Sequence, residues 1–309
     1  MERIVDIATD GLHLSAFRGF LLVQKEREEV GWVALDDIHA IIVHAHGVTW
    51  TTNLLVALAE RGALMVLCAS NHHPTVLALP IEGHHAQGAR IRAQWDAPKP
   101  LLKQLWRQIV VAKIVMQRSL LAALGKAEAS GFDLLARRVK SGDPENVEAQ
   151  AARRYWPALM GEDFRRDRTS EDANALLNYG YTVMRSCVAR AVVGSGLHPT
   201  IGLHHTNRGN AFALADDLIE PFRPLVDAAV TQLISKQLLT VNPQTKRHLA
   251  EVITFDVQLG GMTSTVSHAA IKLAQSLARS FEQKKADLLF FDPPTPIEWR
   301  TIGNDEALG

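Results

Sequence analysis

The first 80 residues contain short apolar runs, several of which alternate with polar positions as strands with one buried face do. Charged or glycine-containing turns separate these runs, and residues 26–29 have the form of a hairpin turn. The expected strands begin at Ile4, Leu12, Phe20, Val30, Ile38, Leu64 and Val76. Thr51 can cap a helix that ends at Gly62, because its side-chain oxygen can accept a backbone N–H. The pattern predicts a β-rich N-terminal domain over residues 1–80.

From residue 101 to about residue 291 the apolar positions recur every three or four residues, which is the period of an amphipathic helix. One long helix is predicted by Leu101, Leu105, Ile109, Ala112, Val115 and Leu120, and a short one by Phe132, Leu134 and Leu135. Asp143 followed by Pro144 predicts the start of the next helix, and Gly161 predicts its end. A capping-box pattern over residues 169–172 predicts another helix, which ends near Gly194.

These two patterns predict an α+β protein, in which the β-rich domain is followed by a larger all-α domain over residues 101–295. Residues 81–100 are rich in glycine, histidine and proline, so we interpret them as a connector. Residues 296–309 follow a proline-rich segment and are predicted to form a C-terminal tail. The sequence contains no Gly-rich phosphate loop and no nucleophile elbow, which argues against a nucleotide-binding fold and against a serine hydrolase.

The composition bounds the class of protein. Apolar residues make up 47% and charged residues 21% of the 309 residues, which is typical of a globular chain with room for two domains. No apolar run approaches the roughly 18 residues that span a bilayer, and no signal-peptide pattern opens the sequence. Cys68 and Cys187 lie in apolar runs, where we expect buried thiols and not disulfides or metal ligands. We therefore expect a cytoplasmic protein without a membrane segment.

The distribution of charge is more informative than the balance of 33 basic and 33 acidic residues. Basic side chains gather between residues 126 and 168: Arg137, Arg138, Lys140, Arg153, Arg154, Arg165, Arg166 and Arg168. A neutral protein can carry such a stripe on one face and bind nucleic acid with it. Alternatively, these residues lie on exposed helix faces and pair with local acids such as Glu145 and Glu162. The sequence leaves both interpretations open.

Residues 202–227 carry the densest polar chemistry of the chain. His204 and His205 lie in a polar loop, and Asp217 and Glu220 follow at a spacing that puts them on one helix face. Pro221 then interrupts the helix, because proline has no N–H and restricts the preceding residue. One imidazole and two carboxylates beside a helix break could bind a hard divalent cation. The alternative is that Asp216, Asp217 and Glu220 form a solvated face, as charge runs usually do.

Glu148 is the second candidate site residue. On the predicted helix it shares a face with Ala152 and Tyr155, which is mainly apolar. A carboxylate that points toward an apolar interior is costly unless it is paired or binds a metal ion. Glu148 is therefore either a functional acid or a boundary residue that pairs with Arg153 or Arg154.

Two further histidine pairs, His72/His73 and His84/His85, could be metal ligands. Adjacent residues of a strand point to opposite faces, however, and the whole sequence contains only two cysteines. A zinc site at these positions is therefore disfavoured.

Three stretches of the chain together carry a family resemblance: residues 148–156, residues 174–181 with their Asn-Tyr-Gly-Tyr core, and residues 202–227. In this order they closely resemble the CRISPR-associated adaptation integrase, the enzyme family that inserts new spacers into a CRISPR array. The resemblance extends over most of the chain. The sequence from Asp217 to Pro224 is most similar to the family members found beside type II effector nucleases. Three ordered motifs are far more specific than any one of them.

The resemblance implies roles for individual residues. Glu148, His205 and Glu220 match the catalytic metal ligands of the family, and Asp217 matches an acid that supports or joins the metal site. His204 has no implied role. The implied cation is Mg²⁺ or Mn²⁺. The helix behind the site is implied to be supported by Asn174, by Asn178 and by either Tyr179 or Tyr181.

The resemblance also implies a reaction and partners. A DNA 3′-hydroxyl attacks a phosphodiester at the CRISPR repeat, with associated endonuclease activity, and the DNA-binding side chains would be Arg137, Arg138, Arg153, Arg154, Arg165 and Arg166. The implied partners are protospacer and repeat DNA, a second copy bound symmetrically through residues 1–80, a second small adaptation protein and the effector nuclease. Two alternatives stay open, which are a metal-dependent DNA endonuclease without integration and a catalytically idle DNA-binding scaffold.

Overall fold

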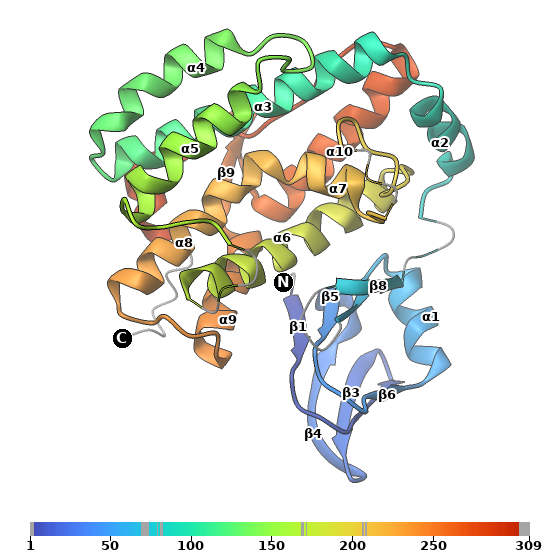
Figure 1. The fold of residues 1–309 in the computed structure, drawn as a ribbon. Coiled ribbons are helices and arrows are strands. Elements are labelled where there is room, and N and C mark those ends of the chain that lie inside the picture. Colours follow the sequence, from blue (N-terminus) through green and yellow to red (C-terminus); the bar gives the residue numbers. More distant parts are fainter. Residues whose placement is uncertain are drawn as a thin grey trace. The chain divides into compact units, whose positions relative to one another are not determined.

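A computed structural model describes residues 3–68, 74–78, 80, 83–167, 170, 172–205, 207 and 209–302 of the chain. The chain divides into two compact units, Met1–Gln87 and Gly88–Gly309 (Figure 1). The first unit contains most of the strands and the second contains most of the helices.

Where the structure describes it, the N-terminal unit contains two four-stranded sheets and the helix α1. The first sheet has the order β1 (Arg3–Ile7), β5 (Ile38–Val43), β7 (Leu64–Cys68) and β8 (Pro74–Ala78). The second has the order β4 (Glu28–Ala34), β3 (Phe20–Lys25), β2 (Leu12–Phe17) and β6 (Thr49–Trp50). A short turn, η1 (Leu35–Asp37), precedes β5, and helix α1 (Thr52–Glu60) begins after Thr51, which caps it as predicted. All of the strands predicted in this unit are confirmed, and among its described residues only the two-residue β6 was missed.

The two sheets and α1 share one apolar core. Leu14 and Leu21 come from the second sheet, Ile41 comes from the first and Leu54 comes from α1, and all four side chains are fully buried. Leu14 lies on the buried face of an alternating strand, whereas every residue of β5, including Ile41, is buried.

The C-terminal unit contains ten helices within the described residues. They are α2 (Gln87–Trp95), α3 (Lys99–Ala123), α4 (Phe132–Arg138), α5 (Val147–Met160), α6 (Ala173–Gly194), α7 (Ala213–Leu218), α8 (Arg223–Ser235), α9 (Pro243–Glu251), α10 (Val266–Gln283) and α11 (Pro296–Thr301). Three short turns, η2 (Ala127–Gly131), η3 (Glu220–Phe222) and η4 (Val252–Thr254), and two strands, β9 (Asp256–Leu259) and β10 (Met262–Thr265), complete it.

Two helices organise this unit. Helix α6 packs against α7, α8, α9 and α10, and helix α3 packs against α4, α5, α8 and the turn η3 (Figure 1). Gly180 explains how closely α6 approaches α8, because a Cβ at this position would lie 2.5 Å from Cγ1 of Val226. The glycine of the Asn-Tyr-Gly-Tyr motif is therefore a packing requirement.

Three domain predictions need correction. Residues 81–100 are more than a connector, because α2 and the start of α3 lie within them. The C-terminal unit is not all-α, since β9 and β10 form a hairpin around Gly260 and Gly261, which have positive φ angles. Residues 296–302 are not a tail, because α11 buries Trp299, whose Nε1 donates to Oγ of Ser119 at 2.9 Å.

The start of α5 also differs from the prediction. Asp143 has a φ of 49°, which is outside the helical range, and the helix begins at Val147 after the N-cap Asn146. Asp143 still satisfies the helix terminus, because its carboxylate accepts the N–H groups of Val147 and Glu148 at 2.8 and 3.0 Å. The predicted end at Gly161 is confirmed.

Helix α6 ends at Gly194, as predicted, and its N-cap is Asp172. Thr169 and Glu171 of the expected capping box lie outside the described residues. Cys187 is buried as expected and Cys68 is half-buried, and neither forms a disulfide. Within the described residues, no helix combines the length and apolar character needed to cross a bilayer.

Candidate functional site

Helix α3 forms one wall of the candidate site. Trp106 and Lys113 are seven residues apart, which corresponds to two helical turns, so both side chains lie on the same side of α3. Trp106 contacts the loop that carries His204 and His205, and Lys113 contacts Glu148 and Glu220. Glu148, Glu220 and His205 thus all contact α3, for which the sequence pattern predicted only an amphipathic helix.

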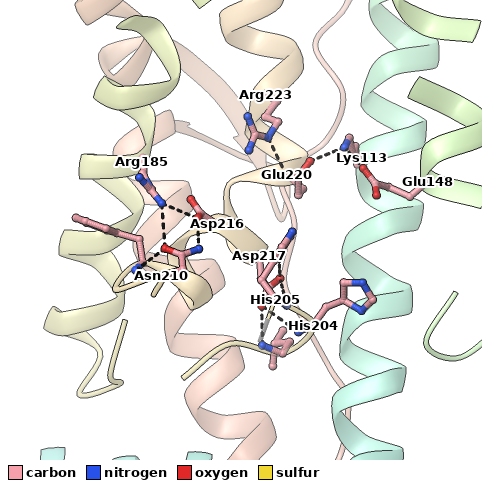
Figure 2. Close-up of polar contacts among 12 residues, drawn as sticks. Lys113, Glu148, Arg185, His204, His205, Asn210, Asp216, Asp217, Glu220 and Arg223 are labelled. Carbon is pink, nitrogen blue, oxygen red and sulfur yellow. Dashed lines mark hydrogen bonds and ion pairs between the residues drawn. The ribbon is translucent and has the colours of Figure 1, made fainter. Parts of the chain in front are cut away.

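Glu148 and Glu220 converge on the ammonium of Lys113. Nζ of Lys113 donates to Oε1 of Glu148 and lies 2.5 Å from Oε2 of Glu220 (Figure 2). The other oxygen of Glu220 accepts a hydrogen bond from Nε of Arg223 at 2.8 Å. Two acids from separate elements, α5 and η3, therefore share one cation.

The surroundings keep these groups charged. Burial alone would raise the pKa of Glu220, which is only 6% exposed, but Arg223 and Lys113 outweigh burial and lower the pKa to about 2. Burial would likewise lower the pKa of Lys113, but the charges of Glu220 and Glu148 outweigh it and raise that pKa. Glu220 and Lys113 are therefore ionised at neutral pH.

The predicted helix break positions Glu220. Helix α7 ends at Leu218, and Glu220 begins the turn η3, in which Pro221 occupies the second place. The alternative of a solvated acidic face is wrong. Asp217 and Glu220 are buried, and Asp216 accepts from Arg185 at 2.5 Å and from Nδ2 of Asn210 at 2.7 Å.

Asp217 holds the histidine loop in place. Its carboxylate is fully buried and accepts the N–H groups of Leu203, His204 and His205 at 2.6, 3.1 and 3.3 Å. Its Oδ1 also lies 2.6 Å from Nδ1 of His205 (Figure 2). A Cβ at Gly202 would lie 2.5 Å from the carbonyl oxygen of His205, so this tight loop requires glycine. Both oxygens of Asp217 are thus engaged, which favours the supporting role over direct metal binding.

His205 and His204 have different surroundings. The hydrogen bond with Asp217 raises the pKa of His205, burial opposes this shift, and the charge of Glu220 adds to it. Because Nδ1 faces Asp217, Nε2 is the ring nitrogen left for a ligand. His204 instead stacks on Trp106, with ring centroids 4.3 Å apart and planes 2° from parallel. The surroundings therefore favour His205 over His204 as the candidate metal ligand.

The residues fit a hard divalent cation, with one rearrangement. Two carboxylates that converge on a positive charge, and an imidazole whose Nδ1 is fixed by a carboxylate, form the donor set that Mg²⁺ or Mn²⁺ uses. No group of three His, Cys, Asp or Glu residues is already assembled as a metal site in the described part of the chain. The ammonium of Lys113 occupies the point where Glu148 and Glu220 meet, so it must move before a divalent cation can bind there.

Comparison with known proteins identifies the family. Residues 5–253 match the family described as CRISPR associated protein Cas1. The chain is also 36% identical to the CRISPR-associated endonuclease Cas1 of Neisseria meningitidis serogroup C (strain 8013), over 94% of this chain and 95% of that protein. The chain belongs to the Cas1 family. The resemblance drawn from the three sequence motifs is therefore confirmed.

Solved structures support the same fold. A casposase bound to an integration product has a TM-score of 0.79 and 22% identity, and the match covers 93% of this chain and 92% of the casposase. A Cas6-RT-Cas1–Cas2 complex has a TM-score of 0.73 and 18% identity, covering 93% of this chain and 35% of that chain. At these identities the likeness concerns the fold, which is a strand-rich N-terminal unit followed by a larger helical one.

The basic residues of this Cas1-family chain fall into two groups. Arg137, Arg153 and Arg154 are exposed on α4 and α5, which pack against each other. Arg138 pairs with Glu145 at 3.3 Å, and Lys140 also donates to Glu145, as the local-pairing interpretation predicted. The proposed pairing of Glu148 with Arg153 or Arg154 is wrong, because Glu148 pairs with Lys113.

Arg165 and Arg166 have internal partners. Arg165 donates to the carbonyl oxygens of Glu162 and Phe164 at 2.6 and 2.8 Å. Arg166 donates to Oδ1 of Asn174 at 2.9 Å and to Oδ1 of Asn178 at 2.6 Å. Arg166 therefore has a structural task that the charge pattern did not reveal, and its guanidinium is not presented as a free DNA contact. Arg168 lies outside the described residues.

A buried acid ties three helices together behind the site. Asp227 of α8 accepts hydrogen bonds from the hydroxyl of Tyr155 of α5, at 2.7 Å, and from the hydroxyl of Tyr181 of α6. Burial raises the pKa of Asp227 to about 6, although the two phenols oppose the shift. Tyr181 also lies under the guanidinium of Arg223, 4.6 Å from the ring centroid. Of these residues, only Tyr181 was among the helix supports that the family resemblance implied, and Tyr155 and Asp227 were not predicted to bind each other.

The remaining histidine pairs do not assemble a metal site where the structure describes them. His84 and His85 stack on each other, with centroids 4.2 Å apart, and Nδ1 of His84 accepts the N–H of Ala86. His72 and His73 lie outside the described residues.

Proposed function

We propose that this protein is a metal-dependent DNA integrase that inserts new spacers into a CRISPR array. The observation that carries the proposal is the convergence of Glu148 and Glu220 on one cation position, beside an imidazole that Asp217 orients. Membership of the Cas1 family and the casposase-like fold support it. The type II form remains part of the proposal.

In the proposed reaction a DNA 3′-hydroxyl attacks a phosphodiester of the target strand. A new bond joins this 3′-oxygen to phosphorus, and the bond from phosphorus to the target strand's own 3′-oxygen breaks. A bound Mg²⁺ or Mn²⁺ would lower the pKa of the hydroxyl, neutralise phosphate charge and stabilise the leaving oxygen. No protein nucleophile is required for this exchange.

The residues of the chain divide this task among them. Glu148 and Glu220 would hold the cation through their carboxylates, and His205 would add Nε2, because Asp217 engages its Nδ1. Asp217 fixes the loop through three backbone N–H groups, so it acts as a positioning residue. Arg223 holds Glu220 from the side opposite to Lys113, which fixes the direction of its carboxylate (Figure 2).

DNA binding is proposed for the exposed arginines near Glu148. Arg153 and Arg154 belong to α5, which also carries Glu148, and Arg137 belongs to the neighbouring α4. Contacts from such side chains to phosphates position a duplex without reading its sequence. The DNA would be a protospacer and the CRISPR repeat.

The N-terminal unit is proposed to form the symmetric dimer. Its second sheet exposes Phe17, Val30 and Trp32, and Trp32 is 63% exposed. Large exposed apolar side chains on one sheet often mark a protein interface. A second small adaptation protein is the proposed partner of that dimer, with the effector nuclease as a further one. The Cas6-RT-Cas1–Cas2 complex among the fold neighbours supports the former.

A strand-transfer assay tests the proposal. The substrate is a branched DNA with a free 3′-hydroxyl, and its control has a 3′-dideoxy end that cannot join. We expect a joined product with Mn²⁺ and the free hydroxyl only, measured with and without the small partner protein. Hydrolysis of both substrates at the same rate without joining would indicate an endonuclease. DNA binding that is equal in chelator, without any Mn²⁺-dependent product, would indicate a scaffold.

A further inference from the structure

Lys113 has no task in the proposed reaction, although it occupies the centre of the site. Its side chain is 10% exposed and rises from α3 between apolar residues that include Ile109 and Ile114. A buried ammonium is costly unless its charge is compensated. Glu148 and Glu220 compensate it, and they come from two other elements, α5 and η3.

Glu148 and Glu220 also depend on Lys113. Without the ammonium, two carboxylates would face each other across the site, and like charges at this separation repel strongly. Arg223 would remain, but it engages Oε1 of Glu220, while Lys113 lies at Oε2. Lys113 therefore supplies the positive charge that lets Glu148 and Glu220 converge.

A divalent cation and this ammonium cannot hold the same position, because both are positive and both need the same oxygens. We propose that Lys113 is a built-in counter-cation, which bridges Glu148 and Glu220 while no divalent ion is bound and withdraws when one binds. The inference rests on the proposed function, since it requires a divalent ion that uses these two acids. Withdrawal is feasible because lysine has a flexible four-carbon stem and the side chain of Glu148 is 29% exposed.

The proposal predicts that the Lys113 bridge stabilises the empty site and weakens the binding of a divalent ion. The bridge keeps the empty site assembled, but it reduces the apparent affinity for a divalent ion by the fraction of molecules in which it is closed. If the bridge is open in about one molecule in ten, removing Lys113 should tighten Mn²⁺ binding about tenfold. The same change should lower the melting temperature in chelator, because the two carboxylates lose their counter-charge.

The test compares wild type, Lys113→Met, Lys113→Arg and the control Lys103→Met without DNA. Lys103 is an exposed lysine on the same helix, so its replacement leaves the site intact. The measurements are the Mn²⁺ dissociation constant by titration calorimetry and the melting temperature in chelator and in Mn²⁺. We expect Lys113→Met to bind Mn²⁺ about tenfold tighter and to melt lower in chelator, with Mn²⁺ restoring its melting temperature. Lys113→Arg and Lys103→Met should resemble wild type.

Several results would overturn the inference while leaving the metal site intact. The first is a Mn²⁺ affinity of Lys113→Met that is unchanged or weaker than that of wild type. The second is a Mn²⁺ affinity of Lys113→Arg that equals that of Lys113→Met. The third is a Lys113→Met protein that stays unfolded even in Mn²⁺. A Glu220→Gln variant tests the proposed metal site itself, independently of the role of Lys113. If wild type and Glu220→Gln bind Mn²⁺ equally, the proposed metal site itself is wrong.

Discussion

Two buried carboxylates, Glu220 and Asp227, lie seven residues apart in the chain and have opposite surroundings. Glu220 faces the cations Arg223 and Lys113, which lower its pKa to about 2 in spite of burial. Asp227 faces the hydroxyls of Tyr155 and Tyr181, and burial raises its pKa to about 6. Burial is the first influence on both groups, so the neighbours decide the outcome.

The difference separates a proposed metal ligand, Glu220, from an acid that connects helices, Asp227. Cations keep Glu220 charged on the side where Glu148 also arrives, which suits an acid that is to bind a metal ion. Phenol hydroxyls satisfy the oxygens of Asp227 and connect α5, α6 and α8. Arg223 stands between the two regions, since it pairs with Glu220 and covers the ring of Tyr181.

The histidine loop offers a further test of the proposed metal site. His205→Ala should reduce strand joining at least about tenfold, because even outer partners of metal ligands contribute that much. His204→Ala should retain most activity, since His204 stacks on Trp106. A protonated imidazole has no free lone pair, so activity at limiting Mn²⁺ should fall as pH drops through the raised pKa of His205.

The measurement is a pair of pH–rate profiles at low and high Mn²⁺ for wild type and both variants. Excess Mn²⁺ should move the midpoint to lower pH, because the cation competes with the proton. A midpoint that ignores the Mn²⁺ concentration, or an essential His204, would contradict the assignment.

For Asp227 we predict a pH effect on stability: the folded protein should become less stable as pH rises. Because the folded-state pKa of Asp227 lies above its unfolded value near 3.8, the folded protein binds more protons between these values. The contribution of Asp227 protonation to the free energy of unfolding is therefore complete below pH 3.8 and is lost as pH rises through about 6. Relative to Asp227→Asn, wild type should lose about 1 kcal/mol of unfolding free energy between pH 5 and pH 8.

Denaturant unfolding of both proteins at these two pH values measures the effect. The asparagine variant does not titrate and so serves as the reference. A difference between the two proteins that stays constant with pH would show that Asp227 does not titrate between pH 5 and pH 8, which would contradict its raised pKa.

The smallest expected effect concerns the exposed arginines of α4 and α5 and the binding of duplex DNA. Replacing Arg137, Arg153 or Arg154 by alanine should each lower the salt slope of duplex binding by about 0.9, because each loses one phosphate contact. Arg166→Ala should instead lower thermal stability and leave the slope unchanged, since Arg166 binds Asn174 inside the protein. Binding titrations at several salt concentrations measure the slope, and an unchanged slope in the first group would make those arginines simple surface residues.

Local patterns predicted most of the fold. Alternation gave the strands of the N-terminal unit, and the long apolar stripe gave α3. The helix break at Pro221 was predictable because proline acts on its own neighbours. The hairpin of β9 and β10 escaped detection, since strands of four residues are too short to display a period. The start of α5 was misplaced because the left-handed backbone at Asp143 has no local signature.

The site was predictable only in part. The motifs brought Glu148, His205 and Glu220 together through the family resemblance, and the apolar face around Glu148 gave an independent hint. Lys113 is separated from Glu148 by 35 positions, and Asp227 is separated from Tyr155 by 72. No spacing rule links residues across such distances, so their pairing required the fold. A lysine in the middle of the apolar stripe of α3 was the one available signal.

Strand joining by Glu220→Gln and Asp227→Asn tests the central claim most directly. Both changes replace a buried carboxylate by an amide of the same shape, at positions seven residues apart. In Mn²⁺, at a temperature where circular dichroism shows both variants folded, Glu220→Gln should lose at least about 100-fold in joining rate, because a metal ion contributes several kcal/mol to this reaction. Asp227→Asn should stay within a few-fold of wild type. Near-normal joining by Glu220→Gln, or an equal loss in both variants, would contradict the account.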